Sequence, residues 1–287
     1  MTFVAPESRP LPELPERPDG APPPRSEADD WPAWAAPVAL VAGLLGAFVG
    51  GVLVVLVAEV AGVDTGRGDT PPGVLLGATA LQDVSLIAAA IVFARMTGPV
   101  WAAHFGLRPT PFWPGAGAVV LTYVTFVILA AIWTTLVGSP DKEPLLDELG
   151  VDESTLLLVL GIATVCVAAP IVEELFFRGF FYRALRNWAR PAGAATITGV
   201  VFGAMHASSS PVEHLVPLAV LGALFCALYQ VTGSLYPCIV LHAINNSVAF
   251  GIDQDWGWEI APLAAGSLAA CALIAWTVAR RWRPETR

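Results

Sequence analysis

The sequence predicts an all-α membrane protein, a bundle of about eight transmembrane helices preceded by a disordered N-terminal tail. Of its 287 residues, 55% are hydrophobic and only 14% are charged, whereas soluble domains carry about 25% charged residues. The apolar residues also form long runs separated by short polar segments. Such runs form helices in lipid, because a helix satisfies every backbone polar group internally.

Residues 1–30 differ from the rest of the chain. They contain eight prolines, charges of both signs and no long apolar run. A segment of this composition cannot bury enough surface to offset the entropy lost on ordering. We therefore expect a disordered, proline-rich cytoplasmic tail, followed by a polytopic membrane domain at residues 31–287.

Eight apolar segments follow the tail, with lengths near the 20 residues that cross a hydrocarbon core of about 30 Å. The fifth and seventh are short and interrupted, which is typical of helices that other protein segments surround. The segments are residues 34–58, 74–94, 115–137, 155–177, 193–207, 215–231, 235–251 and 259–279.

The basic residues predict the orientation of these helices. With the N-terminus in the cytoplasm, twelve arginines fall on the cytoplasmic side and only Arg67 and Lys142 outside, as the positive-inside rule requires. Both termini are therefore predicted to be cytoplasmic, and the excess of arginine over lysine suggests a bacterial plasma membrane. The net charge of −9 argues against a nucleic acid partner, which would need a basic face.

Ionisable residues within the apolar segments carry the functional signal, because each costs about 2.5–3.5 kcal/mol at a helix centre. Glu174 and Arg178 are four residues apart on the fourth segment, so they share a helix face and are expected to form an ion pair. Glu173 is rotated by about 100° from Glu174. Left without its own cation, it suits a general base or acid, although a purely structural, hydrogen-bonded glutamate is the alternative.

His206 on the fifth segment can be placed relative to Glu173 by arithmetic. A turn is expected at residues 190–193, where proline and glycine interrupt the helix. Glu173 lies 18 residues before Pro191 and His206 lies 15 residues after it, so the two arms differ by only about 4.5 Å in length. The two side chains can therefore meet at one depth, unless His206 only packs against its neighbours.

His242 and Asn246 lie four residues apart on the seventh segment, and hence on one helix face. An imidazole beside a carboxamide can hold a developing oxyanion. Hydrogen bonds that only join helices are the alternative use of such residues in a membrane bundle.

These three groups of residues, in this order, resemble the CAAX prenyl proteases and their bacterial relatives, the CPBP or Abi-type intramembrane proteases. That family carries the motifs Glu-Glu-x-x-x-Arg, Phe-x-x-x-His and His-x-x-x-Asn. The resemblance covers a catalytic core at about residues 155–250. The matching residues are Glu173, Glu174 and Arg178, then Phe202 and His206, then His242 and Asn246.

The resemblance implies an intramembrane endopeptidase that hydrolyses a peptide bond of a membrane-associated substrate, either CAAX-type or another lipidated protein or peptide. By resemblance, Glu173 and His206 would activate a water molecule, and His242 and Asn246 would stabilise the oxyanion. The residues expected to support them are Glu174, Arg178 and Phe202.

Members of the family have been described both as metal-dependent and as glutamate-dependent. If a metal is bound, zinc would be the ion and Glu173, His206 and His242 its ligands. The sequence lacks a His-Glu-x-x-His pair, whose two imidazoles share one helix face. A metal-free mechanism without a cofactor is therefore the favoured interpretation.

Two other functions fit the membrane architecture. One is a catalytically silent protein of the same fold, acting as a scaffold or immunity factor. The other is an ion- or proton-coupled transporter that uses Asp83, Glu173 and the histidines as a relay. A transporter predicts internal repeats and paired broken helices, and the sequence shows no convincing repeat. The partners expected for the protease are the lipid bilayer and a membrane-associated protein or peptide.

Overall fold

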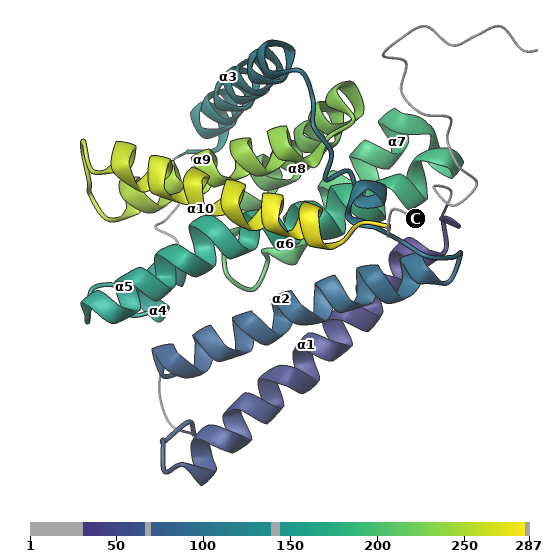
Figure 1. The fold of residues 1–287 in the computed structure, drawn as a ribbon. Helices are drawn as coiled ribbons and strands as arrows, with labels where there is room; N and C mark the ends of the chain where they lie inside the picture. The colour runs from purple at the N-terminus through teal and green to yellow at the C-terminus, as the bar shows by residue number, and fades with distance from the viewer. Residues whose placement is uncertain (1–30, 67–69, 139–143, 285–287) are drawn as a thin grey trace, which may run out of the picture.

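The computed structural model describes residues 31–66, 70–138 and 144–284, and over these ranges the chain forms a helical bundle without strands (Figure 1). Seven helices are long and apolar enough to cross a membrane, and one of them, Thr155–Met205, is 51 residues long. The separate long helices are α1 (Ala35–Val60), α2 (Pro72–Arg95), α3 (Phe112–Val137), α8 (Val212–Thr232), α9 (Leu235–Asp253) and α10 (Ile260–Arg281).

The 51-residue stretch Thr155–Met205 consists of two arms, because the helix is broken at Arg190 (φ 59°, ψ 163°) just before Pro191. The chain turns back there, and the rings of Phe177 and Phe202 pack 5.3 Å apart. In one straight helix those residues would be about 37 Å apart. The predicted turn and the predicted bundle of about eight segments are therefore confirmed, while the predicted tail lies outside the described residues.

The arm before the break contains two π-helical segments, whereas the sequence predicted one regular helix ending at residue 177. It also continues past residue 177 to the break, because no proline lies between residues 177 and 191. The two arms together comprise α5 (Thr155–Ile162), η3 (Ala163–Ala168), α6 (Ala169–Glu173), η4 (Glu174–Phe181) and α7 (Tyr182–Met205), with η3 and η4 in π geometry and the break inside α7. π segments occur frequently at functional sites, and here they enclose Glu173.

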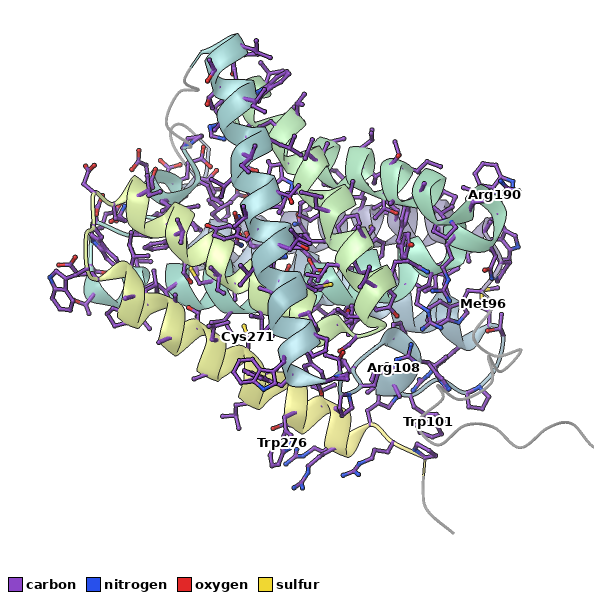
Figure 2. The ribbon with its side chains drawn as sticks, turned by 90° about the horizontal axis from the view of Figure 1, so that it is seen from above. Met96, Trp101, Arg108, Arg190, Cys271 and Trp276 are labelled. Atoms are coloured by element: carbon purple, nitrogen blue, oxygen red, sulfur yellow. The ribbon has the colours of Figure 1, made fainter. Side chains whose placement is uncertain are left out.

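The described part of the chain begins and ends at the same end of the bundle. Near this end, Trp31 packs against Phe105 of the short helix η2 (Ala102–Phe105), and the Phe105 ring packs against Trp282. The N–H of Ala102 donates to the carbonyl of Trp282 at 3.1 Å. Figure 2 shows Trp101, Arg108 and Arg190 at the same end. The first and last described helices thus share an end, as an even number of crossings requires. Which side of the membrane this end faces stays a prediction.

Helices α7 and α8 approach closely at Gly203. A Cβ atom on residue 203 would lie 2.6 Å from the carbonyl oxygen of Leu215 and 2.9 Å from the backbone nitrogen of Ala219. Gly203→Ala is therefore expected to push the helices apart and to lower the free energy of unfolding by about 1–3 kcal/mol. The thermal unfolding midpoint in detergent measures this effect. Gly117→Ala on α3, where a Cβ meets open space, is the control, and equal midpoints for the two variants would contradict the prediction.

Candidate active site

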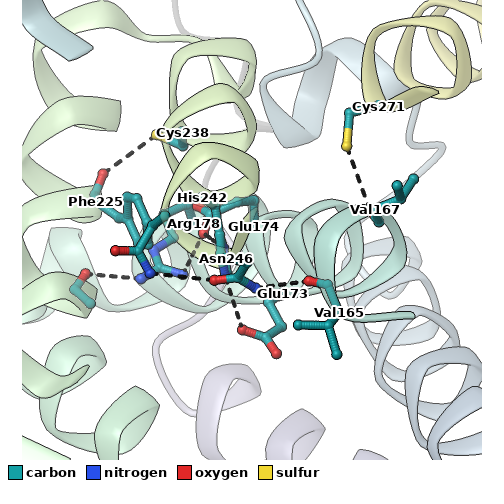
Figure 3. A network of polar contacts seen from close by, with 12 residues as sticks. Val165, Val167, Glu173, Glu174, Arg178, Phe225, Cys238, His242, Asn246 and Cys271 are labelled. Carbon is teal, nitrogen blue, oxygen red and sulfur yellow. Dashed lines mark hydrogen bonds and ion pairs between the residues drawn. The ribbon is translucent and has the colours of Figure 1, made fainter. Parts of the chain in front are cut away.

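A fully buried ion pair forms the centre of the polar network in Figure 3. Nη1 of Arg178 donates to Oε1 of Glu174 at 2.9 Å, and neither side chain is exposed to solvent. The same Oε1 lies 2.8 Å from Nδ1 of His242, and Nη2 of Arg178 donates to the carbonyl of Gly222 at 3.1 Å. The predicted pair is therefore present, and it also fixes the imidazole of His242. Because the carboxylate accepts, the Nδ1–H of His242 donates.

Two aromatic rings cover the arginine of this pair. The guanidinium carbon of Arg178 lies 4.5 Å from the ring centre of Phe202 and 4.7 Å from that of Phe225, distances at which the cation is attracted to the ring face. The Phe225 ring also stacks on His242, with centroids 5.1 Å apart. Phe202 was predicted as a supporting residue. Phe225 was missed, because a phenylalanine within an apolar run carries no signal of its own.

Glu173 differs from its neighbour Glu174 in being accessible. Its side chain is 21% exposed, and its Oε2 lies 3.7 Å from Nε2 of His242 without a hydrogen-bond partner. It is not paired with Arg178, as predicted. The imidazole next to it is that of His242. No hydrogen bond or ion pair joins Glu173 to His206 within the part of the chain that the structure describes.

His206 lies at the C-terminal end of α7 rather than inside the helix. Its Nδ1 is 2.9 Å from the carbonyl oxygen of Phe202. Only a protonated ring nitrogen can donate a hydrogen bond to a carbonyl oxygen, so Nδ1 carries a proton. In the neutral ring, Nε2 is then the unprotonated nitrogen. The Phe202 ring contacts both imidazoles, with centroids 5.0 Å from His206 and 6.1 Å from His242. The two predicted histidines therefore share one aromatic neighbour.

Asn246 lies one helical turn after His242 on α9. Its Nδ2 donates to the carbonyl oxygen of Val165, in η3, at 2.9 Å. Nδ2 of Asn245 donates to the Oδ1 of Asn246 at 3.4 Å. The carboxamide is thus held from two sides, and sequence reasoning identified neither of the residues that hold it.

Asp83 brings a further carboxylate to this region from α2, which packs against α6 and η4. It is half-buried and close enough to Glu173 for the two negative charges to repel each other. The sequence marked Asp83 as out of place in an apolar segment but did not locate it, and the structure places it on the helix that packs against α6 and η4.

The residues named as ligands for a metal do not converge. Over the described ranges, no three histidine, cysteine, aspartate or glutamate side chains are grouped so that they could hold a metal ion. Nδ1 of His242 and Nδ1 of His206 are engaged with a carboxylate and a backbone carbonyl, an arrangement that would leave only Nε2 of each ring for a metal. As they stand, these residues do not fit a zinc site. The metal-free mechanism stays a prediction.

The fold and these residues define a class of protein, a helical membrane protein with a buried polar network of carboxylates, imidazoles and a carboxamide. In this chain, residues 155–248 match the family of Rce1-like type II CAAX prenyl endopeptidases. This match confirms the resemblance that the three motifs indicated, for about a third of the chain, and the family implies protease activity. Neither the curated proteins nor the solved structures contain a match to the chain.

Proposed function

We propose that the protein is an intramembrane endopeptidase that hydrolyses a peptide bond of a membrane-associated protein or peptide. The observation that carries this proposal is the contrast between the adjacent glutamates. Glu174 is fully buried and its Oε1 is bonded to Arg178 and His242, whereas the side chain of Glu173 is 21% exposed and is not paired with Arg178. One glutamate therefore supports the site, and the other is available for chemistry.

In the proposed reaction, Glu173 acts as general base and takes a proton from a water molecule as the water oxygen attacks the scissile carbonyl carbon. The unprotonated Nε2 of His206 orients that water by accepting its second hydrogen. The carbonyl oxygen becomes an oxyanion. As the tetrahedral intermediate collapses, the C–N bond breaks and the proton on Glu173 passes to the leaving nitrogen. The products are a carboxylic acid, which keeps the second proton of the water, and an amine; transfer of that proton to the amine gives a carboxylate and an ammonium group.

Asn246 and a doubly protonated His242 are proposed to donate hydrogen bonds to the oxyanion, which would be their largest contribution because the negative charge develops only in the transition state. In His242 the donor would be Nε2–H, because Nδ1–H donates to Glu174. Glu174 serves this role indirectly, because it fixes the ring of His242 at 2.8 Å. Arg178 and Phe202 in turn hold Glu174 and shape the aromatic surroundings of the site.

The substrate and the reaction can be tested together with the purified protein in lipid vesicles. The substrates are a prenylated peptide ending in a CAAX sequence, the same peptide without the lipid, and a set of apolar transmembrane peptides. We expect cleavage to add one heavy oxygen from labelled water to the new carboxylate, as detected by mass spectrometry. We also expect a chelator to leave the rate unchanged. If no peptide is cleaved, the proposed function is wrong, and loss of cleavage with the chelator alone would contradict the metal-free mechanism.

A further inference from the structure

The carbonyl of Val165 is left without a donor in its own helix. In the π segment η3, hydrogen bonds join residues five apart, and the N–H of Ala169 donates to the carbonyl of Thr164. The next bond in this pattern would run from residue 170 to Val165. Residue 170 is proline, which has no N–H. A carbonyl at this position needs a partner from elsewhere, because unpaired backbone groups are unfavourable away from water.

The side chain of Asn246 supplies that partner from α9. Its Nδ2 donates to the carbonyl of Val165 at 2.9 Å, although the two residues are 81 positions apart. The next carbonyls along the helix are also approached from outside, because Sγ of Cys271 lies 3.9 Å from the oxygen of Cys166 and 3.7 Å from that of Val167. Figure 3 shows the contacts to Val165 and Val167 side by side. The backbone before Pro170 is therefore a set of acceptors for α9 and α10.

A second proline in the bundle has the same effect away from the site. Pro217 lies inside α8 and cannot donate to the carbonyl of Glu213, four residues earlier. That carbonyl instead accepts a hydrogen bond from Nε1 of Trp133 on α3 at 2.8 Å. An intrahelical proline in this protein thus frees a carbonyl that a polar side chain of another helix then binds. Of these two carbonyls, that of Val165, freed by Pro170, binds a residue of the candidate active site.

The bond to Val165 determines which end of the Asn246 carboxamide faces which neighbour. If the amide flipped, Oδ1 would face the Val165 oxygen, and two acceptors cannot form a hydrogen bond. The contact from Asn245 to Oδ1 of Asn246 at 3.4 Å favours the same orientation. We propose that the carbonyl freed by Pro170 orients Asn246 so that its second N–H is available to the oxyanion. This role makes Pro170 and Val165 positioning residues, and it rests on the proposed function.

The variant Pro170→Ala tests this role because it restores a backbone N–H that can compete with Asn246 for the Val165 carbonyl. We expect kcat to fall by about tenfold, part of the loss that follows removal of an oxyanion donor, with KM unchanged. Pro217→Ala changes the equivalent proline outside the site and should leave kcat unchanged. An unchanged kcat in Pro170→Ala, or an equal loss in both variants, would overturn the proposal.

A double-mutant cycle with Asn246→Ala separates positioning from a general structural effect. If Pro170 acts through Asn246, the double variant Pro170→Ala/Asn246→Ala should have a kcat and an unfolding midpoint no lower than those of Asn246→Ala alone. Additive losses in either quantity would overturn the proposal. The unfolding midpoints report on the hydrogen bond even if no peptide is cleaved, so the failure of this inference and that of the proposed function are distinguishable. Should Pro170→Ala not fold, an ester in place of the peptide bond between Val165 and Cys166 weakens the same acceptor, and the same loss of kcat is expected.

Discussion

Replacing Glu173 with glutamine is expected to lower kcat for peptide cleavage by about 10²- to 10⁴-fold, the range that a positioned general base contributes. The amide keeps the shape of the side chain but cannot accept the proton of the attacking water. The unfolding midpoint of the variant should change little, because the Glu173 side chain is partly exposed and its Oε2 has no hydrogen bond to lose. The measurement is the rate of peptide cleavage in vesicles, together with the thermal unfolding midpoint.

A glutamate outside the site provides the control for this substitution. Glu153 is exposed just before α5, and Glu153→Gln removes the same charge without touching the site. It should cleave at the wild-type rate. Cleavage by Glu173→Gln at that rate would exclude Glu173 as the base and leave the fold without its proposed chemistry.

Replacing Arg178 with methionine is expected to have the largest effect on stability. The substitution leaves the buried Glu174 carboxylate without its cation, and breaking one side of a buried ion pair costs about 3–5 kcal/mol. The loss extends to His242, since the same carboxylate oxygen holds that ring. We expect a large decrease in the unfolding midpoint and in the yield of folded protein from membranes.

Two further variants make the test of Arg178 specific. Arg280→Met removes an exposed arginine at the end of α10 that lies 4.2 Å over the Trp276 ring, and its midpoint should stay near that of the wild type. Adding Glu174→Gln to Arg178→Met should restore part of the lost stability, because no charge then remains unpaired. If Arg178→Met unfolds at the wild-type temperature, the buried pair does not stabilise the fold.

The apolar segments, the turn at Arg190 and the Glu174–Arg178 pair could be predicted because each depends on local sequence. Hydrophobic runs specify helices in lipid, proline limits the residue before it, and a spacing of four residues selects one helix face. These features needed no knowledge of how distant helices pack.

The contacts between helices could not be predicted in the same way. The distance along a helix axis placed Glu173 and His206 at one depth, but it gave no information on their rotation about the axis. One extra residue in a helical turn rotates everything after it by about 100°, and hydrophobic periodicity does not reveal the π segments η3 and η4. This is why the imidazole beside Glu173 is that of His242, and why the bond from Asn246 to Val165 was not foreseen.

The aromatic rings around Arg178 have a consequence for how a peptide can be held. An arginine in a cavity is the usual receptor for a carboxylate, through two parallel N–H donors. Here the rings of Phe202 and Phe225 cover the guanidinium of Arg178, and its terminal nitrogens already bond Glu174 and the carbonyl of Gly222. Arg178 is therefore closed to ligands, and the free carboxyl end of a peptide would have to be bound by groups elsewhere in the protein.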